Sequence, residues 1–205
     1  MTLPIPQPAI DAIIGAGRRM DRRNWVPATA GNLSVRLAEG RVAVTRSGIH
    51  KGHLTPEAIV AVDLQGQPED PALRPSAETL LHCGIYRRFP AAGAVLHGHS
   101  IANTVLSRRA GKSLDLARYE LLKAFPGLAT HDARVAVPVF DNDQDIPRLQ
   151  AAVEARWAAL DVIPPGYLIR GHGVYVWARE MEAALARLEA LEFMLECELL
   201  EGRIG

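Results

Sequence analysis

The chain has 205 residues, of which 48% are hydrophobic and 22% are charged, a balance that predicts a packed globular protein with a sizeable core. Its 23 basic residues are matched by 23 acidic ones. This zero net charge argues against a nucleic-acid-binding protein, which needs an excess of Lys and Arg to neutralise phosphates. Two cysteines are present, Cys83 and Cys197, without the C-x-x-C spacing of a metal or redox pair, so we expect free thiols.

The N-terminal residues 1–14 lack the basic segment followed by an apolar segment that is typical of a signal peptide. No apolar run approaches the ~20 residues needed to span a bilayer. We therefore expect a cytoplasmic protein. No repeat, low-complexity tract or linker divides the sequence, which predicts a single domain over residues 1–205.

Hydrophobic periodicity predicts helices and strands along the whole chain. The predicted helices share apolar residues spaced three or four apart, and they cover residues 8–23, 76–89, 101–109, 119–124, 146–160 and 180–200. The predicted strands are short alternating or apolar runs, and they cover residues 33–37, 42–45, 59–64, 94–96, 135–137, 167–169 and 174–177. Ser76 is the expected N-cap of the second helix, and Pro138 is expected to end the strand before it.

The order of these elements indicates the fold class. Helices lie at both ends of the chain and between strands, and several neighbouring strands are close enough in sequence to form hairpins. We therefore expect an α/β protein with three α/β/α layers, in which helices cover a mostly antiparallel central sheet.

The clearest candidate site consists of three histidines. His97 and His99 flank a glycine at the end of an apolar strand, and because alternate residues of a strand point to one face, their imidazoles should emerge side by side. His172 lies between two glycines at the tip of a predicted hairpin. Three histidines with an open fourth position are typical of a catalytic zinc site, and imidazole also suits other divalent metals. We predict that these three residues bind one metal ion.

A second candidate site is suited to a phosphate. Small hydroxyl residues, glycines and amides occur at strand boundaries in residues 29–34 and 45–48, and Ser76 precedes helical N–H groups that favour an anion. Each segment taken alone is more often an ordinary turn, so the prediction depends on their combination. The candidate phosphate-binding residues are Gly31, Asn32, Ser47, Gly48, Lys51 and Ser76.

Two carboxylates are candidate catalytic residues. Glu78 lies in the predicted first turn after Ser76, and Glu120 lies in the predicted helix 119–124. Either is able to act as a general acid or base if it faces the metal. Both also have structural explanations, because Glu78 complements a helix dipole and Glu120 pairs with Lys123. The spacing alone leaves both interpretations open.

These motifs, in this order, resemble the class II aldolase/adducin family. The matching segments are G-N-x-S, S-G, P-S-A-E, H-G-H-S and G-H-G, at residues 31–34, 47–48, 75–78, 97–100 and 171–173, and they extend over nearly the whole chain. The resemblance implies the fold of that family and a zinc ion bound by His97, His99 and His172. It also implies a homotetramer whose active site lies at a subunit interface.

Two further segments are similar to the methylthioribulose-1-phosphate dehydratases of methionine salvage within that family. They are residues 47–51 and residues 119–124, the second followed by Gly127, Thr130 and His131. The similarity implies a zinc-dependent dehydratase (a lyase) acting on a small phosphorylated ketose, 5-methylthioribulose 1-phosphate. It also implies that Glu120 is the acid/base, because the matching carboxylate has this role in that branch.

Two other functions are compatible with the same motifs. Sugar-phosphate aldolases of the family, which cleave fuculose, rhamnulose or ribulose phosphates, use the glutamate that matches Glu78, and this chain retains it. An adducin-like interaction module would be expected to have lost its metal ligands, whereas all three are present here. The segment around Glu120 favours the dehydratase.

Overall fold

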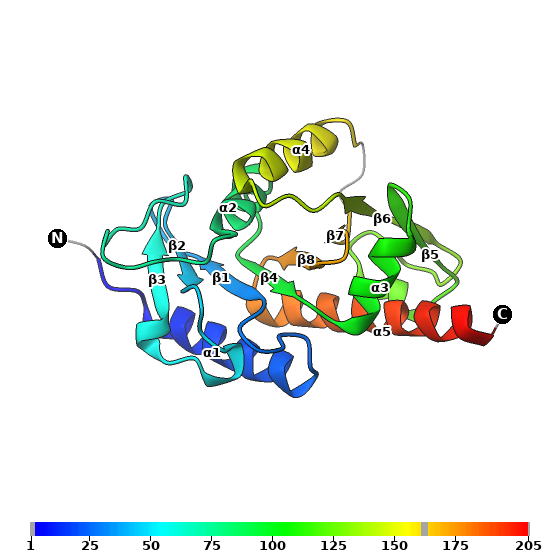
Figure 1. Cartoon of the computed structure of the whole chain (residues 1–205), viewed down its shortest axis with the longest axis horizontal. Coiled ribbons are helices and arrows are strands. Elements are labelled where there is room, and N and C mark those ends of the chain that lie inside the picture. Colours follow the sequence, from blue (N-terminus) through cyan, green and yellow to red (C-terminus); the bar gives the residue numbers. More distant parts are fainter. Residues whose placement is uncertain (1–2, 161–163, 205) are drawn as a thin grey trace.

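The computed structural model describes residues 3–160 and 164–204 (Figure 1). Among these residues, eight strands form one sheet in the order β3-β2-β1-β4-β8-β7-β6-β5. The strands are β1 (Asn32–Arg36), β2 (Val42–Thr45), β3 (Ile59–Val62), β4 (Ala94–Gly98), β5 (Ser113–Ala117), β6 (Arg134–Phe140), β7 (Tyr167–Ile169) and β8 (Gly173–Ala178). The α-helices are α1 (Gln7–Arg22), α2 (Thr79–Arg88), α3 (Ile101–Arg109), α4 (Ile146–Ala158) and α5 (Met181–Ile204). Short 3-10 helices are η1 (Lys51–His53), η2 (Pro56–Ala58) and η3 (Glu120–Ala124).

The sheet is mostly antiparallel, as predicted. Each neighbouring pair of strands is antiparallel except β6 and β7, which run parallel. The register places three residues in one row across the sheet, with Asn32 of β1 opposite His97 of β4, and His97 opposite Tyr175 of β8. The row therefore includes His97, one of the three candidate metal ligands, and places Asn32 and Tyr175 on either side of it.

Helices cover both faces of the sheet, with α1 and α5 on one side and α2 and α4 on the other (Figure 1). Because alternate residues of a strand face opposite sides, Leu96 packs into the core under α1 and α5, whereas its neighbour Val95 packs into the core under α2 and α4. The three-layer α/β/α prediction is therefore confirmed. In the described part of the chain, no helix combines the length and the apolar character needed to cross a membrane.

The start of the second helix differs from the prediction. Helix α2 begins at Thr79, with Glu78 at the N-cap position, so Ser76 does not cap it. Residues 76–79 form a turn instead, in which Thr79 donates backbone and hydroxyl hydrogen bonds to the Ser76 carbonyl, at 3.1 and 2.7 Å. The Ser76 N–H donates to the carbonyl of Thr45 at 3.0 Å. This contact with the end of β2 keeps the segment out of the helix.

The strand at Pro138 also differs from the prediction. Strand β6 continues through Pro138 to Phe140 and pairs with β5, a strand that we do not predict. The N–H of the next residue, Val139, donates to Lys112 on the β5 side. Since successive N–H groups point to opposite edges, the missing N–H of Pro138 faces β7, whose pairing with β6 begins only at Val139. The proline therefore removes no hydrogen bond between the strands of the sheet.

A buried carboxylate joins α5 to the first turn of α3. Glu192 is fully buried, and it accepts hydrogen bonds from Ser100 Oγ at 2.6 Å and from Asn103 Nδ2 at 2.8 Å. Ser100 also caps α3, because its Oγ accepts the Asn103 N–H at 3.0 Å. Burial raises the pKa of Glu192 to about 7, although the two donors lower it. This contact fixes the chain directly after His99.

We expect Glu192 to make stability depend on pH. Its pKa is higher in the folded chain than in the unfolded chain, so its stabilising contribution is full below about pH 4.5 and is lost as pH rises through about 7. The shift corresponds to about 3 kcal/mol at most. Glu192→Gln cannot ionise, so its melting temperature relative to wild type should increase between about pH 5 and pH 8. A constant difference over this range would contradict the expectation.

Candidate functional site

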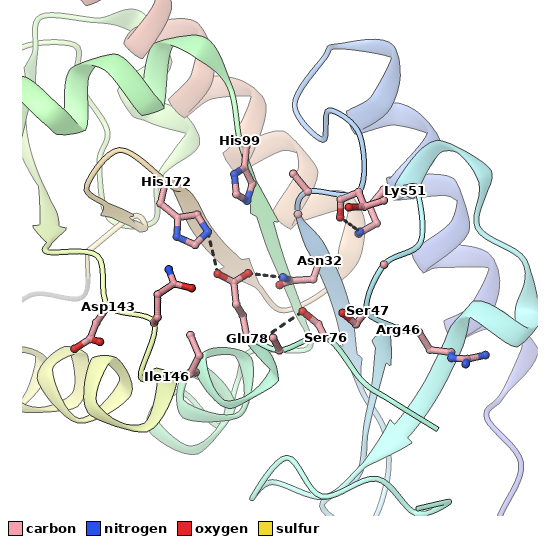
Figure 2. A pocket seen from close by; sticks show the side chains of 16 residues that line it. Asn32, Arg46, Ser47, Lys51, Ser76, Glu78, His99, Asp143, Ile146 and His172 are labelled. Atoms are coloured by element: carbon pink, nitrogen blue, oxygen red, sulfur yellow. Dashed lines mark hydrogen bonds and ion pairs between the residues drawn. The ribbon is translucent and has the colours of Figure 1, made fainter. Parts of the chain in front are cut away.

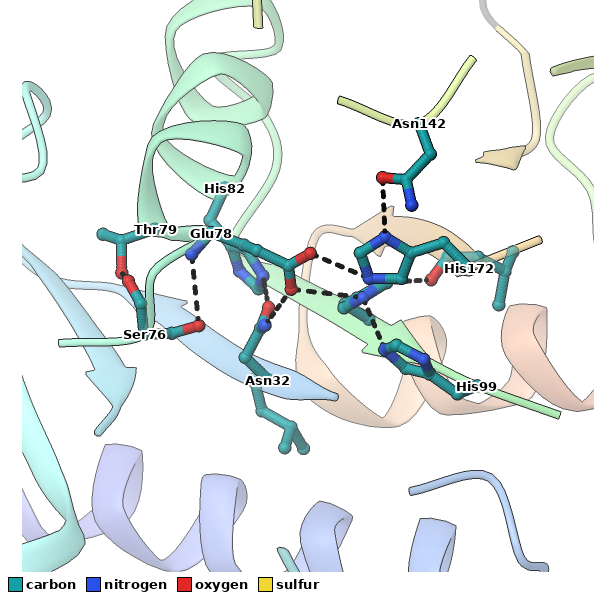
Figure 3. Close-up of polar contacts among 12 residues, drawn as sticks. Asn32, Ser76, Glu78, Thr79, His82, His99, Asn142 and His172 are labelled. Carbon is teal, nitrogen blue, oxygen red and sulfur yellow. Dashed lines mark hydrogen bonds and ion pairs between the residues drawn. The ribbon is translucent and has the colours of Figure 1, made fainter. Parts of the chain in front are cut away.

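Three imidazoles meet at the end of β4 (Figure 3). His97 is the fourth residue of that strand and is fully buried, His99 follows the strand directly, and His172 lies in the turn between β7 and β8. Their candidate ligand nitrogens all lie within 4.8 Å of one another. The Nε2 atoms of His97 and His99 are 2.9 Å apart. The fold thus brings together the three histidines that the sequence motifs select.

Hydrogen bonds to the outer ring nitrogens orient two of these imidazoles. Nδ1 of His97 lies 3.0 Å from the carbonyl oxygen of Val174, and Nδ1 of His172 lies 3.2 Å from Oδ1 of Asn142. Because both partners are acceptors, each Nδ1 carries the proton and each Nε2 presents a lone pair to the centre of the cluster. The His97 ring is also stacked on Tyr175, with centroids 4.0 Å apart.

Glu78 lies against the same nitrogens. Its Oε1 is 2.9 Å from His172 Nε2, and its Oε2 is 3.3 Å from His97 Nε2. Oε2 also accepts a hydrogen bond from Asn32 Nδ2 at 2.7 Å. Burial opposes ionisation, but the positive charge and the hydrogen bonds that His97 and His172 provide when protonated hold the pKa of Glu78 far below its usual range. A cation among these imidazoles therefore keeps the carboxylate ionised.

The contact between Glu78 and these imidazoles requires a positive charge. With the ring protons on Nδ1, the carboxylate oxygens and the Nε2 atoms are all acceptors, and acceptors at such distances repel one another unless a cation lies between them. A proton or a metal ion meets this need. The donor set, three imidazoles beside one carboxylate, fits a divalent transition metal.

A pocket of about 350 Å³ lies beside the histidine cluster (Figure 2). His99, His172 and Glu78 form one part of its wall. The candidate phosphate-binding residues all line it as well, namely Gly31, Asn32, Ser47, Gly48, Lys51 and Ser76. The structure therefore brings both sequence-predicted sites into one cavity, in which a ligand is able to contact both at once.

Backbone geometry explains two of the glycines in this wall. Gly31 and Gly48 have φ angles of +74° and +76°, in the left-handed region that favours glycine. At Gly31 a Cβ atom would also lie 2.7 Å from the carbonyl oxygen of His97. Glycine is therefore needed at position 31, where the loop before β1 passes close to the backbone of β4.

Lys51 is a buried cation in the pocket wall. Only 2% of it is exposed, and its Nζ donates hydrogen bonds to the carbonyl oxygens of Thr29 and Ile49 at 2.6 and 2.7 Å. Burial lowers the pKa of Lys51 to about 8, and the charge of Glu78 opposes this shift. The backbone of Lys51 packs closely against α1 at Gly17, where a Cβ atom would collide with its carbonyl oxygen.

Another part of the pocket wall consists of residues that the motifs do not reveal. Asp143 and Gln144 come from the loop between β6 and α4, and Ile146 is the first residue of α4. The loop also provides Asn142, the partner of His172. The sequence feature that could have identified this loop is a polar segment directly after an apolar strand, a common position for binding residues.

Glu120 lies outside this pocket in the described protomer. It is the first residue of η3, its side chain is 71% exposed, and it forms an ion pair with Lys123. Hydrogen bonding to Lys123 lowers the pKa of Glu120. Within one chain, the structure places Glu78 at the histidine cluster but does not place Glu120 there.

Comparison with known proteins identifies the family. The family model described as Class II Aldolase and Adducin N-terminal domain matches residues 11–199. A methylthioribulose-1-phosphate dehydratase of Gluconacetobacter diazotrophicus is 58% identical over 198 residues, which cover 96% of this chain and 95% of the relative. The protein of that name from Methylococcus capsulatus is 53% identical, with 91% and 90% of the two chains covered.

Solved structures agree with this assignment. An L-fuculose-1-phosphate aldolase from Thermus thermophilus is 27% identical, with a TM-score of 0.74 over 95% of each chain. A second L-fuculose 1-phosphate aldolase shows the same fold at 21% identity, with a TM-score of 0.81 over 98% of this chain and 89% of that one. With one family model matching residues 11–199, the chain belongs to the class II aldolase and adducin family.

Proposed function

We propose that this protein is a methylthioribulose-1-phosphate dehydratase of methionine salvage, built as one domain over residues 1–205. It would convert 5-methylthioribulose 1-phosphate to 2,3-diketo-5-methylthiopentyl 1-phosphate. One observation carries the proposal: two of the three clustered histidines, a carboxylate and the candidate phosphate-binding residues line one pocket, in a chain 58% identical to a relative of that name.

The three imidazoles would hold one zinc ion per subunit. The convergence of His97, His99 and His172, and the need for a cation beside Glu78, support this assignment. When bound, such an ion polarises carbonyl and hydroxyl oxygens of the substrate as a Lewis acid. His97 and His172 contribute pre-oriented lone pairs, because the acceptors at Nδ1 fix their tautomers.

The opposite end of the pocket would hold the C1 phosphate. The turns at Gly31-Asn32 and Ser47-Gly48, together with Ser76, provide N–H and hydroxyl donors, and Lys51 provides the positive charge. Fixing the phosphate places carbons C2 to C4 of the ketose beside Glu78 and the histidines. Holding reactants in this way accounts for a large part of the rate enhancement in many enzymes.

We assign the removal of the C3 proton to Glu78. Its ionised carboxylate accepts that proton, and the C3–H electron pair then forms an enediolate across C2 and C3. The C4–oxygen bond breaks next, and the leaving hydroxyl takes a proton and departs as water. The resulting enol takes a proton from solvent at C4 and becomes the 2,3-diketone.

Departure of the C4 hydroxyl calls for a second acid, and we assign it to Glu120 of a neighbouring subunit. The similarity of residues 119–124 to the dehydratase branch supports this role. Because Glu120 is exposed and lies outside the pocket of its own chain, it would reach a site only in an assembly. The proposal therefore includes a homotetramer with its active site between subunits.

Phosphate binding should weaken as pH rises through about 8. Lys51 has a lowered pKa of about 8, so it loses its positive charge over this range. Lys51→Met removes the charge at every pH and should raise KM by about 10-fold or more at pH 7. Measuring KM for the ketose phosphate at about pH 7 and 9 checks this. If KM of Lys51→Met still increased with pH as it does in wild type, loss of the Lys51 charge would not be the cause of that increase.

An aldolase is the second candidate function, because Glu78, the carboxylate inside the pocket, matches the glutamate that aldolases of the family use. Product analysis by mass spectrometry separates the two. The zinc-loaded dehydratase should convert 5-methylthioribulose 1-phosphate to a product lighter by one water with its carbon chain intact. Release of dihydroxyacetone phosphate and an aldehyde, from this substrate or from fuculose 1-phosphate, would assign the aldolase instead.

A further inference from the structure

A buried line of polar side chains connects α2 to β1, and Figure 3 shows its first three members, Glu78, Asn32 and His82. Glu78, His82 and Tyr86 are spaced four residues apart and lie on one face of α2, while Asn32 and Ser34 are two residues apart on one face of β1. Four helical residues advance about 6 Å and two strand residues about 6.7 Å. Because these advances nearly match, side chains from helix and strand alternate along the line.

Each neighbour in this line is in hydrogen-bond contact with the next. Asn32 Nδ2 donates to Glu78 Oε2 at 2.7 Å, and Asn32 Oδ1 contacts His82 Nε2. His82 Nδ1 lies 2.7 Å from Ser34 Oγ, which lies 2.8 Å from the Tyr86 hydroxyl. His82 and Ser34 are fully buried, and Asn32 and Tyr86 are nearly so. The contacts are therefore shielded from competing solvent.

One arrangement of protons satisfies the whole line. Nδ2 of Asn32 lies against the Glu78 carboxylate, so Asn32 presents its NH₂ group to Glu78 and its oxygen to His82. His82 must then carry its proton on Nε2, which leaves Nδ1 to accept from Ser34. Ser34 in turn accepts from Tyr86. Burial lowers the pKa of His82 to about 3, which keeps the ring neutral, as this arrangement requires.

We propose that His82 is a positioning residue for the reaction, and that it acts by holding the Asn32 amide in the one orientation that presents a donor to Glu78. The inference rests on the proposed role of Glu78. His82 does not line the pocket and is not among the three clustered histidines. Without its Nε2–H, the Asn32 amide can rotate and turn its oxygen toward Glu78, which would displace the carboxylate.

His82→Leu and His82→Gln test this role as a pair. Leu has no donor, and kcat should fall by about 10- to 100-fold while zinc content stays at the wild-type level. Gln carries an NH₂ group that is able to donate to Asn32, so most of the loss in kcat should be recovered.

Cys83→Ala is the matched control for general destabilisation of α2. Cys83 is buried beside His82, but its Sγ lies 3.5 Å from the carbonyl oxygen of Asp63 and takes no part in the line. This variant should lower the melting temperature without lowering kcat. Wild-type kcat in His82→Leu, or an equal loss of kcat in Cys83→Ala, would overturn the proposal.

The tautomer of His82 gives a readout independent of activity. Nitrogen-15 NMR of histidine-labelled protein, with His82 assigned by its absence in His82→Gln, should show Nε2 protonated and Nδ1 unprotonated. A proton on Nδ1 would overturn the proposal. If wild type does not remove water from the ketose phosphate, the proposed function fails. The NMR result then still decides whether His82 holds the Asn32 amide in the proposed orientation.

Discussion

Replacing Glu78 by Gln should lower kcat by about 10²- to 10⁴-fold, the usual contribution of a general acid or base. Glutamine keeps the shape of the side chain and is still able to accept the Asn32 hydrogen bond through its oxygen, but it takes no proton from C3. Because His97, His99 and His172 all remain, and three histidines suffice for a catalytic zinc site, zinc content should not change. Steady-state kinetics and metal analysis of one preparation measure both quantities. Wild-type kcat in this variant would remove Glu78 from the chemistry.

The same substitution at Glu120 tests the proposed second acid. Glu120→Gln should also abolish turnover with metal content intact, if Glu120 is the second acid. Co-expressing Glu78→Gln and Glu120→Gln subunits should restore part of the activity, because some sites then combine an intact Glu78 from one subunit with an intact Glu120 from another. Mixed assemblies that stay inactive would contradict a shared active site.

Replacing His172 by Ala should remove the bound metal and, with it, the activity. His172 lies in a surface turn, so its loss should perturb folding less than loss of the buried His97. The site would retain two imidazoles of three, and a catalytic zinc site normally keeps three protein ligands. Zinc content after dialysis, measured beside circular dichroism, checks the expectation. Stoichiometric zinc in the folded variant would contradict the assignment.

Asn142→Ala is the control for this experiment, because it should weaken zinc binding without removing a ligand. Asn142 fixes the His172 tautomer through Nδ1 but offers no ligand atom to the cluster. Its loss should weaken zinc affinity by about 10- to 100-fold, as is typical for the outer partner of a metal-binding histidine. The effect should be smaller than that of His172→Ala.

The sequence predicted those parts of the site that depend on local periodicity. His97 and His99 were identifiable because an apolar strand leads directly into them, and His172 because glycines flank it in a hairpin. The turn at Ser76 was not predicted, since a hydrogen bond to Thr45, distant in the sequence, keeps it out of the helix. Strand β5 was missed because its pairing with β6 is equally non-local.

The line through His82 shows a second limit of sequence reasoning. The four-residue spacing from Glu78 to His82 and the two-residue spacing from Asn32 to Ser34 are both visible in the sequence. These spacings predict a hydrogen-bonded line only when α2 is known to pack against β1 in this register. Glu120 shows a third limit, because its proposed role depends on a second subunit, and neither the sequence nor one chain contains that contact.

Dehydration in deuterium oxide is the most direct test of the proposed function. The zinc-loaded protein should convert 5-methylthioribulose 1-phosphate to the 2,3-diketone with one deuterium at C4, where the enol takes its proton from solvent, and with no carbon–carbon cleavage. Treatment with a chelator should abolish the conversion. Deuterated dihydroxyacetone phosphate together with an aldehyde would contradict the dehydratase and identify an aldolase on the same site.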